Sequence, residues 1–96
     1  MASKLYMPDG SSRVVTPANG VHWTLEELQG FVGGYIEVVR TTDLKFMVVN
    51  EEGKLPHLNL PYNRAATELN SRLDAIVGPA VVVDTLLEMD GPDDEN

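Results

Sequence analysis

Apolar side chains recur at helical spacing between residues 24 and 32, which predicts a helix with one buried face. The recurring positions are Leu25, Leu28, Phe31 and Val32. Thr24 and Glu27 match a capping box, because the hydroxyl can accept the amide of the third helical residue while the glutamate reaches back. Gly33 or Gly34 suits the left-handed residue that follows a helix.

Much of the remaining chain alternates between apolar and polar residues with a period of two, which is typical of β-strands. Residues 4–17 are expected to form a hairpin around an Asp-Gly turn, and residues 35–40 and 44–49 a second hairpin. The most hydrophobic run, residues 75–83, predicts a central strand that bends at Pro79, where a ladder hydrogen bond is missing.

A second short helix is expected at Pro61, which can occupy its first turn because a proline there loses no hydrogen bond. Ala65, Ala66 and Leu69 give this helix a small apolar face. Gly53, in an earlier turn, is available for a positive φ. Together the elements predict an α+β fold: one small domain, with a mainly antiparallel or mixed sheet of four to five strands and two short helices on one face.

Length and charge divide the chain into a domain over residues 1–87 and an acidic, disordered tail over residues 88–96. The net charge is −8, but five of the fifteen acids lie in the tail, which leaves ten acids against seven bases in residues 1–87. The tail either solubilises the protein or mimics nucleic-acid phosphate toward a basic partner. Because no basic stripe is present, direct nucleic-acid binding is not expected. A domain of this length buries only a small hydrophobic core, and burying more surface between copies would stabilise it, so we expect a homo-oligomer.

Composition disfavours several further classes of protein. The chain has no cysteine, which excludes disulfides, thiolate metal sites and cysteine nucleophiles. The first residues lead into no apolar run, and no segment approaches the ~20 apolar residues that span a bilayer. We therefore expect a soluble cytoplasmic protein without a membrane partner.

Four segments, in this order, resemble a family of small domains of bacteriophages and mobile elements that is known as a domain of unknown function. The segments are Gly33–Val38, Val49–Leu55, Leu60–Thr67 and Ile76–Val83. The resemblance implies a phage-type accessory protein in a bacterial host, and it carries over no enzymatic activity and no catalytic residues.

The residues suggest no catalytic or metal-binding grouping. His22 and His57 lie in no metal-ligand spacing. Glu51 and Glu52 lie in a turn where carboxylates are normally solvated, whereas acid–base catalysis needs a carboxyl with a raised pKa. We therefore predict no enzymatic activity, no metal and no cofactor.

The polar residues that follow Gly53 favour an anionic, nucleotide-like small molecule as the ligand. The start of the Pro61 helix would offer free backbone amides, to which Asn63 and Arg64 add side-chain donors. Tyr62 can stack on a base, and the preceding loop adds two more polar side chains. The predicted ligand-binding residues are Lys54, His57, Tyr62, Asn63 and Arg64.

Two alternatives stay open. Asn63 can instead cap the helix while Arg64 pairs with Glu68 four residues further on. The protein can also be an inhibitor or adaptor that binds a host protein through its acidic surface or through a sheet edge.

Overall fold

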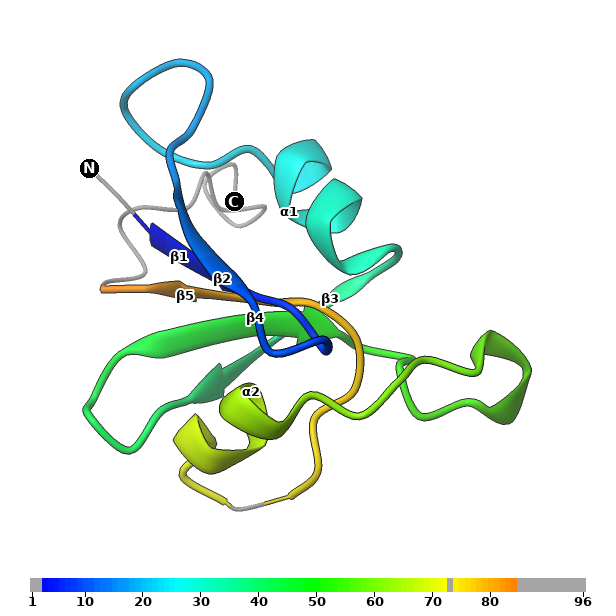
Figure 1. Cartoon of the computed structure of the whole chain (residues 1–96). Coiled ribbons are helices and arrows are strands. Elements are labelled where there is room, and N and C mark those ends of the chain that lie inside the picture. The colour runs from blue at the N-terminus through cyan, green and yellow to red at the C-terminus, as the bar shows by residue number, and fades with distance from the viewer. Residues whose placement is uncertain (1–2, 73, 85–96) are drawn as a thin grey trace, which may run out of the picture.

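The structure is a computed structural model that describes residues 3–72 and 74–84. Its centre is an antiparallel sheet of five strands in the order β2-β1-β5-β4-β3. The strands are β1 (Ser3–Tyr6), β2 (Ser12–Val15), β3 (Ile36–Arg40), β4 (Phe46–Asn50) and β5 (Ala80–Val83). The helices are α1 (Leu25–Val32), α2 (Arg64–Leu69) and the 3-10 helix η1 (Pro56–Leu58), as Figure 1 shows. The α+β prediction and the two hairpins are confirmed. A central apolar strand is also present, but it spans only Ala80–Val83 of the predicted residues 75–83.

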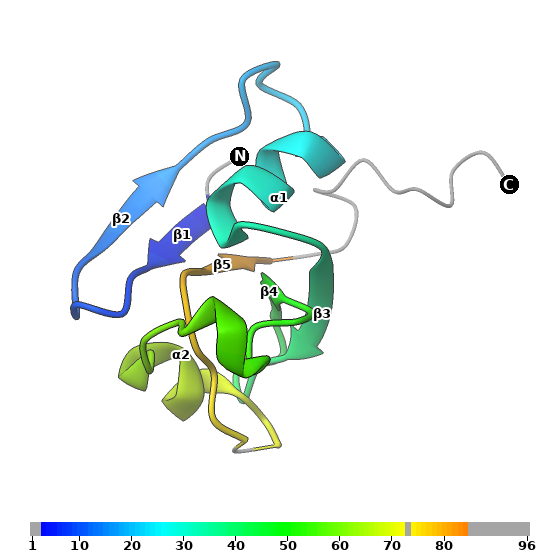
Figure 2. The same cartoon turned by 90° about the vertical axis from the view of Figure 1, so that its right-hand side faces the viewer.

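The prediction that both helices lie on one face was wrong. α1 covers one face of the sheet and α2 the other (Figures 1 and 2). The reason lies in β5, whose four residues are all buried. Val81 and Val83 belong to the core cluster of α1, whereas Ala80 and Val82 belong to that of α2. Because successive side chains of a strand point to opposite faces, a strand buried throughout needs apolar cover on both sides.

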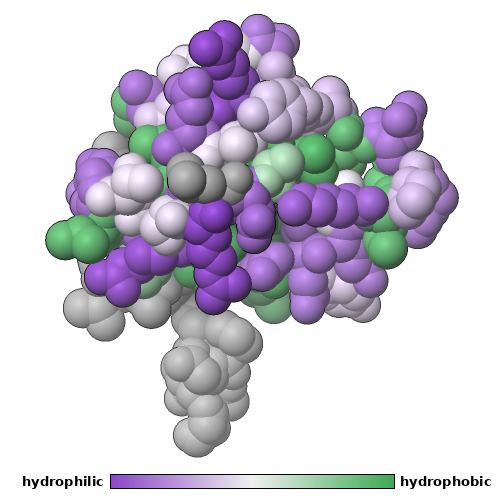
Figure 3. All heavy atoms as spheres, turned by 90° about the horizontal axis from the view of Figure 1, so that it is seen from below, coloured by the Kyte–Doolittle hydropathy of each residue, from purple (hydrophilic) through white to green (hydrophobic). Residues whose placement is uncertain are grey.

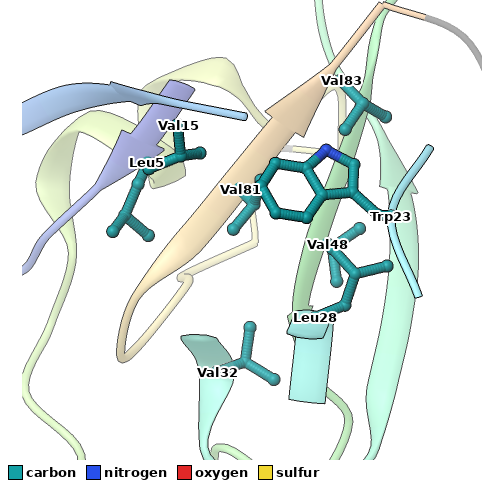
Figure 4. Close-up of a cluster of buried hydrophobic side chains, with 8 residues drawn as sticks. All are labelled: Leu5, Val15, Trp23, Leu28, Val32, Val48, Val81 and Val83. Atoms are coloured by element: carbon teal, nitrogen blue, oxygen red, sulfur yellow. The ribbon is translucent and has the colours of Figure 1, made fainter. Parts of the chain in front are cut away.

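The core on the α1 face is built around Trp23, which is 1% exposed. Its indole packs edge-to-face on Phe31, with 5.4 Å between ring centroids, and its Nε1 donates a hydrogen bond of 2.9 Å to Ser3 Oγ. Figure 4 shows the indole among the aliphatic side chains of this cluster, which are Leu5, Val15, Leu28, Val32, Val48, Val81 and Val83. Trp23 therefore connects β1, α1 and the centre of the sheet.

The predicted capping box holds the start of α1. Thr24 Oγ1 accepts a hydrogen bond of 3.2 Å from the Glu27 amide, and Glu27 Oε1 accepts one of 2.9 Å from the Thr24 amide. Glu27 Oε2 accepts the Ala18 amide at 2.9 Å, which ties the preceding loop to the helix. The hydrogen bonds from the amides of Thr24 and Ala18 lower the pKa of the Glu27 carboxyl. α1 ends at Gly33, which has the predicted left-handed conformation with φ 84°.

Replacing Glu27 by glutamine is expected to reduce the acid sensitivity of the fold. Because the pKa of Glu27 is lower in the folded than in the unfolded chain, its carboxylate stabilises the fold above the unfolded pKa of about 4.3 and loses that contribution as the pH falls through the folded pKa. Glutamine keeps an oxygen that can accept the Thr24 amide and does not titrate, although its NH2 group cannot accept the Ala18 amide.

Urea unfolding between about pH 7 and about pH 3 measures this difference. The unfolding free energy of Glu27→Gln should fall less on acidification than that of the wild type. Glu26→Gln, in the same turn but outside the capping box, is the matched control. Equal acid losses for Glu27→Gln and the wild type would contradict the assignment.

The face that carries α2 is shown from below in Figure 3. Hydrophilic side chains cover most of it, and hydrophobic ones are visible in small areas between them. Within residues 3–72 and 74–84, no helix is long and apolar enough to cross a membrane. The predicted acidic tail, residues 88–96, lies outside the described residues.

Candidate ligand-binding cleft

The segment before α2 is extended, so the prediction that Pro61 occupies the first turn of the helix was wrong. The Gly78 amide donates to the Pro61 carbonyl at 2.8 Å, and the Asn63 amide donates to the Ile76 carbonyl at 2.8 Å. Tyr62 forms an isolated antiparallel bridge between these two hydrogen bonds. Residues 61–63 therefore lie as a short strand beside residues 76–78, and α2 begins only at Arg64.

Asn63 is buried, with none of its surface exposed. Its Oδ1 accepts the Ala66 amide at 3.1 Å and so caps α2. Its Nδ2 donates to the carbonyl of Tyr6 at 3.1 Å and to that of Gly78 at 2.8 Å. These contacts occupy the side-chain amide, so the prediction that Asn63 binds a ligand was wrong, and the alternative that it caps the helix is confirmed.

The other predicted residues are exposed, and a cleft described below is lined by Lys54 but not by His57, Tyr62 or Arg64. The Nε of Arg64 donates a hydrogen bond of 3.1 Å to the Glu68 carboxylate. This is the ion pair of the alternative prediction, although both side chains stay largely exposed to solvent. His57 lies on η1, and Tyr62 is 53% exposed beside the entry to α2. Ligand binding by His57, Tyr62 and Arg64 stays a prediction. Lys54 is different, because it lines a cleft.

This cleft has a volume of about 170 Å³ and opens on the α2 face of the sheet. Val39 and Val49, on adjacent strands, form an apolar floor. The turn over residues 50–54 forms one wall, and residues 70–72 and 74–77 form the other. We call it the 54/72 cleft, because Lys54 reaches it from the first wall and Arg72 from the second.

The two cations of the 54/72 cleft form no ion pair and no cation–π contact in the part of the chain that the structure describes. Lys45 and Arg64 form ion pairs with carboxylates. Lys4 and Arg40 lie over aromatic rings, at 5.5 Å and 5.2 Å from the ring centroids. Lys54 and Arg72 have neither kind of partner among residues 3–72 and 74–84, and both are exposed.

Buried asparagines shape both walls of the cleft. Asn50 Oδ1 accepts the Glu52 amide at 2.7 Å, while its Nδ2 donates to the Val32 carbonyl at 3.1 Å. Asn70 Oδ1 accepts the Arg72 amide at 3.1 Å, and its Nδ2 donates to the Asp74 carbonyl at 3.1 Å. Each Oδ1 accepts the amide two residues further on and so fixes a turn locally, as such side chains commonly do. These hydrogen bonds hold the backbone of Lys54 in one wall of the cleft and that of Arg72 in the other.

The turn that carries Lys54 also needs Gly53, but not for the predicted reason. The φ of Gly53 is not positive. A Cβ at this position would lie 3.0 Å from Val77 Cγ2 and 3.2 Å from the Asn50 carbonyl oxygen. The glycine therefore permits a close approach of the two walls.

Acidic groups share the cleft with the cations. The carboxylates that line it belong to Glu37, Glu51 and Asp74, and all three residues are exposed. The cleft thus offers cationic donors, carboxylate acceptors and an apolar floor side by side. Within residues 3–72 and 74–84, no three His, Cys, Asp or Glu side chains form a group that could hold a metal ion.

Arg72 and the walls of the cleft were not predicted from the sequence. Two asparagines, one at the end of a strand and one at the end of a helix, were the available signal, because asparagine there often organises a turn. This signal does not show that the two turns line one cleft, since that depends on how residues 70–72 and 74–77 pack against the sheet.

Comparison with known proteins gives the family of the chain. No curated protein and no solved structure matches it. Residues 5–92 match the family described as a domain of unknown function (DUF3846), and the chain therefore belongs to that family.

Proposed function

We propose that the protein is a non-catalytic binder of a small, anionic, nucleotide-like molecule, which it holds in the 54/72 cleft. One observation carries the proposal: Lys54 and Arg72, two cations without an ion pair or ring partner among the described residues, line the same cleft. An arginine can bind two oxygens of a phosphate at once, and a lysine adds a compact charge.

The rest of the cleft suits the remainder of such a ligand. The side chains of Val39 and Val49 offer an apolar surface to one face of a base. Glu37, on the same face of β3 as Val39, can accept hydrogen bonds from an amino group or from ribose hydroxyls. The three carboxylates also disfavour ligands that carry negative charge throughout, such as a polynucleotide backbone.

Binding rather than catalysis is supported by the character of the polar groups. The three carboxylates of the cleft are on exposed residues. General acid–base catalysis near neutral pH usually relies on a carboxyl whose pKa is raised by burial. Exposed carboxylates are better suited to hydrogen bonding with a ligand.

Calorimetric titration with a panel of linear and cyclic nucleotides tests the proposal. At least one nucleotide should bind the wild type, and Lys54→Ala and Arg72→Ala should each weaken it by about 10- to 100-fold, because a hydrogen bond to a charged group contributes about 1.5–3 kcal/mol.

Arg64→Ala is the matched control, since Arg64 is also an exposed cation but does not line the 54/72 cleft. It should bind the nucleotide like the wild type. Flat titrations for the whole panel would refute the proposal. Loss of binding in Arg64→Ala with full binding in Arg72→Ala would return the site to the start of α2.

We also propose that the binder acts in the cytoplasm of a bacterial host as an accessory protein of a phage or mobile element, where it keeps its ligand from a host sensor. The resemblance to small phage-type domains supports this role. Expression of the wild type in the host should lower the free concentration of the nucleotide that the panel identifies, while the Arg72→Ala variant should not.

A further inference from the structure

The hydrogen bonds at both ends of β3 reveal which of its backbone groups face β4. The Glu51 amide donates to the Tyr35 carbonyl at 2.8 Å, just before the strand begins. The Thr41 amide donates to the Lys45 carbonyl at 3.0 Å, just after the strand ends. In an antiparallel ladder, residues that exchange hydrogen bonds with the neighbouring strand recur at every second position.

Glu37 and Val39 are therefore the residues of β3 that bond to β4. The N–H and C=O groups of Ile36 and Val38 point away from the sheet. β3 is an edge strand, and among residues 3–72 and 74–84 no other strand pairs with these groups. They form an open hydrogen-bonding edge.

The open edge is short because its far end is covered. The Ser71 amide donates to the Arg40 carbonyl at 3.0 Å, and the Thr42 amide donates to the Leu69 carbonyl at 2.8 Å. The end of α2 and the turn after it thus occupy the edge from Arg40 onward. An added strand has room beside Ile36 and Val38.

A groove of about 490 Å³ runs along this part of β3. Its lining includes Val38 and Arg40 from the α1 face of the strand and Glu37 and Val39 from the α2 face. Side chains from both faces of one strand can line the same groove only where that groove follows the edge of the strand. The open backbone groups therefore lie in a depression.

The groove has a positive end. Arg40 lies there with its guanidinium carbon 5.2 Å from the centroid of the Phe46 ring, and Arg72 lines the same groove. Glu37 is three residues earlier, toward the open end of the strand. A partner with a carboxylate near the arginines and apolar residues beside Ile36 and Val38 complements this arrangement.

We infer that β3 binds an extended acidic–apolar peptide of another protein, which adds to the sheet as a sixth, antiparallel strand. The residue opposite Val39 is acidic and reaches Arg72, the residues opposite Val38 and Ile36 are apolar, and the residue between them donates a hydrogen bond to Glu37. This partner surface goes beyond the proposed nucleotide binding, although Arg72 borders both grooves.

A second copy of the chain is a poor occupant of this edge. The antiparallel pairing of two β3 strands that uses both open positions sets Ile36 opposite Val38 of the second copy. It then sets Glu37 opposite the second Glu37. Like charges directly opposite each other destabilise a strand pair.

The test uses a fluorescein-labelled hexapeptide of sequence Thr-Asp-Val-Thr-Ile-Thr and a matched peptide with Lys in place of Asp. Fluorescence anisotropy should show the Asp peptide binding the full chain at least tenfold more tightly than the Lys peptide. Arg72→Ala should remove most of this preference. Lys54→Ala, which alters the 54/72 cleft alone, should not change peptide binding.

Val38→Pro removes an outward N–H without breaking a hydrogen bond to β4, a change that edge strands tolerate. It should lower peptide affinity at least tenfold and leave nucleotide binding unchanged, because Val38 does not line the 54/72 cleft. Val14→Pro on β2, the opposite edge strand, is the matched control and should bind the peptide normally.

Hydrogen exchange locates the contact independently of these variants. In the free protein the amides of Ile36 and Val38 should exchange at least tenfold faster than those of Glu37 and Val39, and the Asp peptide should remove this difference. Three results would overturn the inference: no binding of the Asp peptide, undiminished binding by Val38→Pro, or protection of Ile36 and Val38 in the free protein. Protection that rises with protein concentration would assign the edge to a second copy, and protection independent of concentration to the chain itself.

Discussion

Replacing Asn63 by alanine is expected to lower the free energy of unfolding by about 3 kcal/mol and the Tm by about 10–20 °C. The side chain caps α2 and also bonds the carbonyls of Tyr6 and Gly78. Alanine would leave these buried groups unpaired, and an unsatisfied buried group costs about 1–3 kcal/mol. Asn63 thus joins the end of β1, the loop before β5 and the start of α2.

Urea unfolding followed by circular dichroism measures this loss. Asn63→Ser keeps an oxygen that can cap the helix but lacks the two N–H donors, so its stability should lie between those of Asn63→Ala and the wild type. Arg64→Ala, at the next position, removes an exposed ion pair and should change the unfolding free energy by about 0.5 kcal/mol or less. A loss below about 1 kcal/mol in Asn63→Ala would contradict the bridging role.

Replacing Trp23 by alanine is expected to be at least as damaging, with a loss of about 3–5 kcal/mol. The indole fills the centre of the core on the α1 face and is 1% exposed. Alanine would leave a cavity and would remove the ring contact with Phe31 and the hydrogen bond from the indole to Ser3. Since small domains are stable by only about 5–15 kcal/mol, the variant should be partly unfolded near 37 °C.

Thermal unfolding compares Trp23→Ala with two other variants. Trp23→Phe keeps most of the apolar contact but loses the hydrogen bond to Ser3, so it should be destabilised less. Tyr35→Ala removes an aromatic side chain from a residue that is 64% exposed and should change stability by about 0.5 kcal/mol or less. Equal effects of Trp23→Ala and Tyr35→Ala would show that the core is not organised around the indole.

The elements that were predicted well are those whose signals are local. The capping box of Thr24 and Glu27 and the left-handed Gly33 define α1 within ten residues of chain. The two hairpins follow from alternating residues around short turns. The position of the helices could also have been deduced more fully, because four consecutive buried residues in β5 require cover on both faces of the sheet.

The candidate site depends on contacts that are distant in sequence, and local patterns could not reveal it. Pro61 is a common residue at a helix start, but the pairing of residues 61–63 with residues 76–78 holds it in an extended segment. Arg72 follows a helix end with no motif around it, and it lines the same cleft as Lys54 only because residues 70–72 and 74–77 lie beside the turn that carries Lys54. Of the five residues predicted to bind a ligand, Lys54 lines the 54/72 cleft.

The most direct test of the 54/72 cleft is a map of backbone amide chemical shifts during titration with the tightest-binding nucleotide of the panel. If the nucleotide binds in this cleft, the largest shifts should fall on Val39, Gly53, Lys54, Arg72 and Ile76, and they should saturate together. Largest shifts at residues 62–65, with Gly53 and Arg72 unmoved, would contradict binding in this cleft.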